Sequence, residues 1–171
     1  MINPNEIKES DLPLIVLSDH SSGFIQWVIK FRTKANYNHG MSMIKPGEFA
    51  SQGGTFSIAP LSRYMTSQSR LKFWKIKGLT DKEKALINRR INNRLNLPKW
   101  KRRYNWIGIF GQATGIKWIS SPWVPFCSQQ VKWDFLDGVI GGIPKHPSPK
   151  ELNTIFKIHK RLELYGRWSA D

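Results

Sequence analysis

The chain contains one cysteine, Cys127, in the sequence Pro-Phe-Cys-Ser-Gln-Gln-Val, at the predicted start of a helix over residues 127–136. A lone thiol can form neither an internal disulfide nor a structural zinc site, so Cys127 is either a buried small hydrophobic residue or a nucleophile. At a helix N-terminus, unpaired backbone amides and the helix dipole would stabilise its thiolate. The Cys127 amide would also be placed to donate to an oxyanion.

His39 is the histidine that best fits a general base, because it opens an alternating pattern from His39 to Ile44 that predicts a strand. A strand would hold the imidazole rigidly. The other three histidines fit less well: His20 lies in a polar loop, His146 lies among prolines, and His159 lies on the apolar side of the last predicted helix. A thiol at a helix start and an imidazole on a strand are the two parts that a thiol hydrolase needs.

A third polar group normally orients such an imidazole. Carboxylates are scarce here, and Glu48 falls at a predicted turn, which leaves Gln52 and Ser51 on the next predicted strand. Gln52 is the first choice, because an amide accepts a hydrogen bond from the ring N–H without adding charge. It would stabilise an imidazolium less than a carboxylate does. Ser51 stays open as the alternative.

Positive charge is concentrated in the middle of the chain. The formal net charge is +15, and residues 70–103 hold 13 Lys and Arg against Asp81 and Glu83. Such a segment predicts contact with an anionic polymer or surface, and a solvated surface that keeps the protein soluble is the other interpretation. The residues expected to bind the anionic partner are Lys72, Lys75, Arg89, Arg90, Arg94, Lys101, Arg102 and Arg103.

The 171 residues predict one domain of the α+β class, with strands mostly in the first half. Two capping boxes open helices: Thr80–Glu83 begins one that Pro98 stops, and Ser148–Glu151 begins one that continues to Leu162. A further helix is expected over residues 22–32. The predicted strands cover residues 12–18, 39–44, 49–52, 55–58 and 70–77.

Composition narrows the class and location of the protein. Hydrophobic residues make up 40% of the chain, with eight Trp and nine Phe, so a disordered chain is not expected. No run approaches the roughly 20 apolar residues of a bilayer span, and the N-terminus does not resemble a signal peptide. We therefore expect synthesis in the cytoplasm, with release by lysis or packing into a virion left open. No metal or cofactor is implied.

Four short stretches of the sequence match motifs of one enzyme group. They are Leu14–Gly23, an apolar strand and polar loop; Asn38–Ile44, a polar-His strand; residues 49–52 with 58–61, a polar residue and a Pro-Leu step; and Phe126–Val131, a Cys-Ser-polar-polar-Val motif. Together they resemble the circularly permuted papain-like hydrolases, the NlpC-like group that includes lecithin:retinol acyltransferase-like proteins. In that group the histidine precedes the cysteine. This chain departs from the pattern at Gln52, where relatives carry Glu or His, and at Gln129, where they carry Glu.

The resemblance implies a small antiparallel sheet or half-barrel packed with helices, and a Cys127–His39 dyad that cleaves an amide or ester. Cell-wall peptide amides are the commonest substrates of that group, followed by lipid esters and amides. The alternative is a non-catalytic basic protein, associated with nucleic acid or a virion. Its aromatic residues would stack on bases among the basic side chains. Those aromatic residues are Trp74, Trp100, Tyr104 and Trp106.

Overall fold

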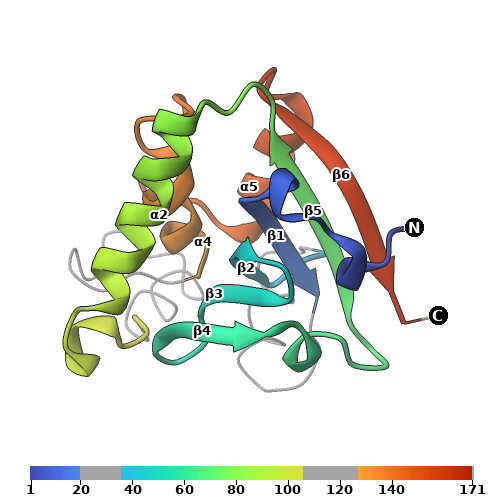
Figure 1. Cartoon of the computed structure of the whole chain (residues 1–171), viewed down its shortest axis with the longest axis horizontal. Coiled ribbons are helices and arrows are strands. Elements are labelled where there is room, and N and C mark those ends of the chain that lie inside the picture. Colours follow the sequence, from blue (N-terminus) through green and yellow to red (C-terminus); the bar gives the residue numbers. More distant parts are fainter. Residues whose placement is uncertain (20–35, 106–126, 171) are drawn as a thin grey trace.

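The computed structural model describes residues 1–19, 36–105 and 127–170. These residues form an α+β structure around a six-stranded antiparallel sheet with the order β4-β3-β2-β1-β5-β6 (Figure 1). The strands are β1 (Leu14–Asp19), β2 (His39–Lys45), β3 (Glu48–Gln52), β4 (Phe56–Pro60), β5 (Arg70–Ile76) and β6 (Leu162–Ser169).

Three helical segments accompany the sheet: α2 (Asp81–Leu95), α4 (Cys127–Val131) and α5 (Pro149–Ile158). Both predicted capping boxes are present, at the starts of α2 and α5. α4 runs directly into a π-helical turn, η5 (Lys132–Leu136). The remaining helical elements are short 3-10 turns, η1 (Pro4–Glu6), η2 (Glu9–Asp11), η3 (Leu61–Arg63) and η4 (Lys99–Arg102).

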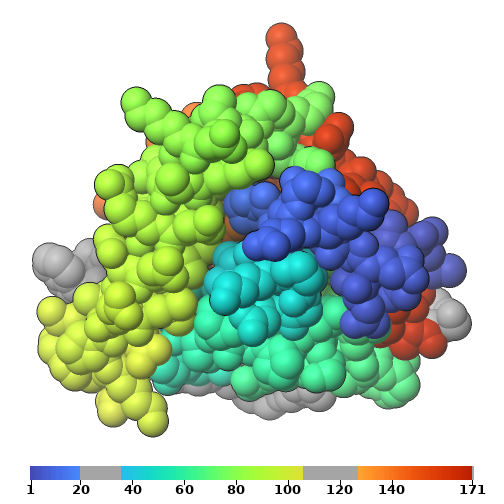
Figure 2. All heavy atoms as spheres, viewed as in Figure 1, coloured from blue at the N-terminus to red at the C-terminus, as the bar shows by residue number. Residues whose placement is uncertain are grey.

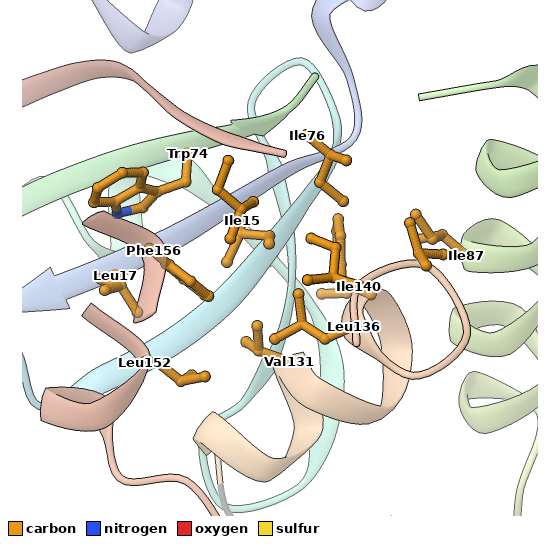
Figure 3. Close-up of a cluster of buried hydrophobic side chains, with 14 of the residues drawn as sticks. Ile15, Leu17, Trp74, Ile76, Ile87, Val131, Leu136, Ile140, Leu152 and Phe156 are labelled. Carbon is orange, nitrogen blue, oxygen red and sulfur yellow. The ribbon is translucent and has the colours of Figure 1, made fainter. Parts of the chain in front are cut away.

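The helices bury one face of the sheet. Alternate strand residues, which share a face because the side-chain period of a strand is two, point toward them. Burying each of these large apolar side chains contributes about 1.5–3 kcal/mol. Figure 3 shows this cluster, with Ile15, Leu17, Trp74 and Ile76 from the strands, Val131 and Leu136 from α4 and η5, Leu152 and Phe156 from α5, and Ile87 from α2.

The opposite face has its own apolar core, covered partly by the N-terminal residues. Ile7 and Leu12 lie in the same cluster as the other set of alternating strand residues, among them Leu14, Met41 and Phe49. Figure 2 shows the N-terminal segment on the outside of the molecule, between α2 and β6 in this view. The sheet is therefore the middle layer, with α2, α4 and α5 on the face described first.

The end of the chain differs from the prediction. The final helix stops at Ile158, His159 caps it, and Leu162 begins β6, where it pairs with Ile76. The turn between α5 and β6, residues 159–161, contains neither Gly nor Pro. Leu162 also continues the apolar helical period, so the sequence pattern predicted a longer helix in place of the turn and the strand. The helix expected over residues 22–32 lies outside the described residues. No helix within the described ranges is long and apolar enough to cross a membrane.

Candidate functional site

Cys127 begins α4, and this helix packs directly on β2. The close approach depends on Gly40: a Cβ there would lie 3.2 Å from Val131 Cγ2 and 3.6 Å from the Cys127 carbonyl oxygen. The thiol is buried, with Sγ 3.9 Å from the Asn38 carbonyl oxygen, and the Gly40 amide donates toward it. The thiol therefore lies against the backbone on both sides of His39.

The imidazole of His39 is held by a chain of two hydroxyl groups. Its Nε2 lies 2.8 Å from Ser51 Oγ, and Ser51 Oγ lies 2.5 Å from the Tyr64 hydroxyl. The rings of His39 and Tyr64 stack, with centroids 5.9 Å apart and an interplanar angle of 13°. Ser51 and Tyr64 are buried, so their hydrogen bonds are shielded from bulk water.

Gln52 does not make the contact that we expected of it. Its Nε2 donates to the Arg102 carbonyl oxygen at 3.0 Å, whereas the neighbouring Ser51 bonds to His39. The physical reason is the strand period of two: successive residues of β3 point to opposite faces, and His39 shares a face with Ser51. Gln52 instead ties β3 to η4.

The thiol lies against the β2 backbone beside His39, but the thiol and the imidazole do not share a hydrogen bond within the described part of the chain. α4 lies on the face of β2 that Gly40 presents, while the imidazole lies on the face of Tyr64 and Phe49. The structure therefore places α4, which carries Cys127, and the His39 imidazole on opposite faces of β2, with no hydrogen bond between thiol and imidazole among the described residues.

Both groups are neutral at pH 7 in this arrangement. Burial raises the pKa of the Cys127 thiol, against the opposing effect of hydrogen bonds from the Gly40 amide and the Tyr104 hydroxyl. Burial, together with the positive charge of Arg63, lowers the pKa of His39 to about 4. The stabilised thiolate expected at the helix start is therefore outweighed by desolvation, which disfavours the charged form.

Two tyrosines belong to the site and were not assigned to it from the sequence. The Tyr104 hydroxyl donates to Cys127 Sγ at 3.6 Å, and Tyr64 is the second member of the chain on His39. Neither lies at a motif spacing from Cys127 or His39. Tyr64 follows the 3-10 turn after β4, so only the antiparallel order β2-β3-β4 brings it back to His39.

The polar residues after Cys127 fasten α4 to the loop before α5. Ser128 Oγ donates to the Pro147 carbonyl oxygen at 2.6 Å, and Gln129 Nε2 lies 3.1 Å from His146 Nδ1. The Gln129 side chain thus faces His146, not the thiol. These contacts fix the orientation of the helix that carries Cys127.

Three of the predicted anion-binding residues contact internal partners in η5, just after η5, or in β4. Arg90 donates to the carbonyl oxygens of Trp133, at 3.2 Å, and Asp137. Arg94 pairs with the buried Asp134 at 3.8 Å. A third arginine, at position 102, donates to the Phe56 carbonyl oxygen at 3.1 Å.

Two lysines of the same predicted set are also engaged internally. Lys72 is buried, donates to Asn153 Oδ1 at 3.2 Å and lies 4.5 Å from the Trp74 ring centroid. Burial lowers its pKa to about 8. Lys75 pairs with Asp11 at 2.8 Å. The predicted residues that are exposed are Arg89, Lys101 and Arg103.

The aromatic residues of the basic segment also include both buried and exposed side chains. Trp74 and Tyr104 are buried, so neither is available to stack on a base. Trp100 is 62% exposed, and Lys101 Nζ lies 5.0 Å from its ring centroid. Trp106 lies outside the described residues.

Within residues 1–19, 36–105 and 127–170, no group of three or more His, Cys, Asp and Glu side chains is arranged to hold a metal ion. The arrangement offers one thiol, one imidazole and two tyrosine hydroxyls. A comparison of the sequence with protein-family models and with curated proteins finds no match.

Proposed function

We propose that the chain is a cysteine hydrolase or acyl transferase that cleaves an amide or ester bond on a permuted papain-like, NlpC-like fold. The observation that carries the proposal is the position of Cys127: it begins α4, and its thiol lies against the backbone on both sides of His39. The chain order, a histidine strand before a cysteine helix, is the order of the permuted group. The antiparallel sheet with helices on one face is compatible with that fold.

In the proposed reaction, Cys127 Sγ attacks the substrate carbonyl carbon while its proton moves to His39. The carbonyl π electrons move onto oxygen, and the Cys127 amide donates to that oxyanion. Collapse of the intermediate breaks the bond to the amine or alcohol, which leaves with the proton from His39. The resulting thioester is then attacked by water, or by an acceptor nucleophile, with His39 taking the proton and returning it to the thiol.

The Cys127 thiol and the His39 imidazole are both neutral before the reaction. Because both groups start uncharged, proton transfer accompanies the attack instead of preceding it. The imidazole must come within hydrogen-bond reach of the thiol when substrate binds, and catalytic hydrogen bonds often tighten only in the complex. Tyr104, already donating to Sγ, stabilises the negative charge that develops there.

The first substrate class is a cell-wall peptide amide, with lipid esters and amides second. This choice comes from the family resemblance. It is supported by the exposed cations Arg89, Lys101 and Arg103, which would hold the enzyme on an anionic polymer or surface.

The test measures labelling of Cys127 by an electrophilic probe and release of amine from purified peptidoglycan, on wild type, Cys127→Ala and His39→Ala. We expect labelling faster than that of glutathione at pH 7 and loss of both signals in the variants. His159→Ala is the matched histidine control and should keep both. The proposal fails if Cys127 reacts no faster than a free thiol, or if losing His39 changes nothing.

A non-catalytic binding protein is the second candidate. It is favoured by the exposed Trp100 with Lys101 beside it, and by the burial that raises the thiol pKa. Base stacking with phosphate contacts would use these exposed groups. Duplex or single-stranded DNA binding that falls steeply with NaCl, and that Cys127→Ser leaves unchanged, would support it.

A further inference from the structure

We infer that Ser51 and Tyr64 form an uncharged hydrogen-bonded relay that positions the His39 imidazole, with Tyr64 acting through Ser51. This inference rests on the proposed function, in which His39 is the general base. Ser51 and Tyr64 are positioning residues, because neither is the group that exchanges a proton with the thiol or the substrate.

The geometry of the relay restrains the ring in two ways. The bond from Nε2 to Ser51 Oγ, at 2.8 Å, sets the rotation of the ring about its own axis. The stacked Tyr64 ring limits its tilt, and Tyr64 is itself held edge-on by Phe49, with centroids 5.5 Å apart and an interplanar angle of 84°. With Nε2 occupied by Ser51, Nδ1 is the nitrogen left for the reaction.

The protons of the relay can be arranged in two ways. In one, Tyr64 donates to Ser51, Ser51 donates to Nε2, and the ring proton is on Nδ1. In the other, Nε2–H donates to Ser51 and Ser51 donates to Tyr64, which leaves Nδ1 free to accept the thiol proton. The proposed reaction uses the second arrangement. In it, Nε2–H donates to Ser51 Oγ both before the transfer, in the neutral ring, and after it, in the imidazolium.

The relay brings no negative charge to the imidazole. The titratable and charged groups around His39 are Arg63 and Tyr64 at the end of η3, and Cys127 from α4. Arg63 disfavours a second positive charge. His39 is thus oriented without being made more basic, and the acid limb of the rate profile should lie below the ordinary pKa of histidine.

The decisive variants are Tyr64→Phe, Ser51→Ala and Ser51→Asp, with Tyr165→Phe as the matched control. Tyr64→Phe keeps the stacked ring and removes only the hydroxyl. Tyr165 also contributes a tyrosine hydroxyl bond, to Asp11 Oδ2 at 3.0 Å, away from His39. The readouts are kcat as a function of pH and the imidazole ¹⁵N shifts of His39, which report its tautomer and its pKa without any substrate.

We expect kcat to fall about tenfold in Tyr64→Phe, the effect of one lost hydrogen bond, and further in Ser51→Ala. Both variants should alter the tautomer of His39, and Tyr165→Phe should alter neither readout. Ser51→Asp should raise the pKa of His39 and shift the acid limb to higher pH. Unchanged ¹⁵N shifts in Tyr64→Phe and Ser51→Ala, or an unmoved pKa in Ser51→Asp, would overturn the relay.

Failure of the relay can be told apart from failure of the proposed function. If no variant, including wild type, cleaves peptidoglycan or reacts with the probe, the hydrolase is wrong, and the ¹⁵N shifts still decide whether Ser51 and Tyr64 orient the ring. If wild type is active and the relay variants match it in kcat, pH profile and ¹⁵N shifts, the hydrolase stands and the relay falls.

Discussion

The two faces of β2 hold the two halves of the candidate site by different means. On the helix face, Cys127 is placed by packing, since α4 fits against Gly40 and the apolar cluster beneath it. On the other face, His39 is placed by hydrogen bonds to Ser51 and, through it, to Tyr64. A packed apolar contact is weakened by any polar substitution and less strongly by a small change in side-chain volume. A hydrogen-bonded relay is broken by the loss of one hydroxyl oxygen. The two halves should therefore respond differently to mutation.

The largest effect on stability should come from the ion pair between Arg94 of α2 and Asp134 of η5. Arg94→Ala leaves the Asp134 carboxylate, 1% exposed, without the Arg94 charge and also removes the packing of the arginine on Phe56 and Trp133. It should lower the free energy of unfolding by about 2–3 kcal/mol at pH 7, because protonation of the carboxyl limits the electrostatic part to about one pKa unit. Burial raises the pKa of Asp134 to about 6, so the loss should shrink at pH 5, where the carboxyl is protonated. Urea denaturation at the two pH values measures it.

The matched control for Arg94 is Arg89→Ala, on the same helix but exposed. We expect this variant to stay within about 0.5 kcal/mol of wild type. Equal losses in the two variants would mean that the Arg94–Asp134 pair between α2 and η5 does not stabilise the fold.

The next effect concerns the fit of α4 on β2. Gly40→Val adds a branched side chain where even a Cβ lies 3.2 Å from Val131 Cγ2, and overpacking of this kind costs about 1–3 kcal/mol. Displacement of α4 should also lower the rate at which Cys127 reacts with the electrophilic probe. Gly47→Ala, at an open turn with φ of 75°, tests backbone strain alone. It should change stability without changing the probe rate.

The two faces should also respond to pH in opposite directions. The pKa of His39 falls from its ordinary 6.5 to about 4, so the unfolded chain binds more protons and stability is lost as the pH falls from about 6.5 to 4. The pKa of Asp134 rises from 3.8 to about 6, so its contribution to stability is gained as the pH falls from about 6 to 3.8.

Variants separate the two contributions. Relative to wild type, His39→Gln should gain stability on moving from pH 7 to pH 5, and Asp134→Asn should lose it. Urea midpoints at each pH give the measurement. Changes of the same sign in both variants would contradict the opposing shifts.

The smallest effect on stability should come from the exposed cations, which we propose contact the anionic partner. Lys101→Ala with Arg103→Ala should change the unfolding free energy by about 0.5 kcal/mol or less. The double variant should elute from purified anionic cell wall at lower NaCl than wild type, because fewer counterions are displaced. Lys160→Ala, also exposed, is the matched control and should elute with wild type.

Much of the fold was predictable because it rests on local patterns. The alternation from His39 to Ile44 gave β2, and the two capping boxes gave the starts of α2 and α5. β6 was not predictable, because its first residue continues the period of the preceding helix. Strand periodicity and helix capping do not predict which strands become neighbours in the sheet.

Some site residues could be predicted from local patterns, and others could not. Cys127 and His39 carry chemistry in their types and in their place on predicted elements. Ser51 could be named but not chosen over Gln52, because the choice depends on which face of β3 meets His39. Tyr64 could not be found at all, since its contact forms only after β3 and β4 fold back on β2. The internal contacts of Arg90 and Arg94 were not predictable for a related reason: a positive charge can be identified in a sequence, but its contact partner cannot.

The π-helical turn η5 sets the rotation of α4 about its axis relative to the residues that follow it. Its wide turn sends the Asp137 amide to the Lys132 carbonyl oxygen, at 2.9 Å, and so leaves the Trp133 carbonyl oxygen to accept from Arg90. In an α-helix each residue turns the chain by about 100°. Deleting one residue from η5 would restore the regular ladder and rotate Cys127 by that angle relative to Asp137. The extra residue in this turn therefore works as an alignment spacer, which lets one short helix face β2 at its start and α2 at its end.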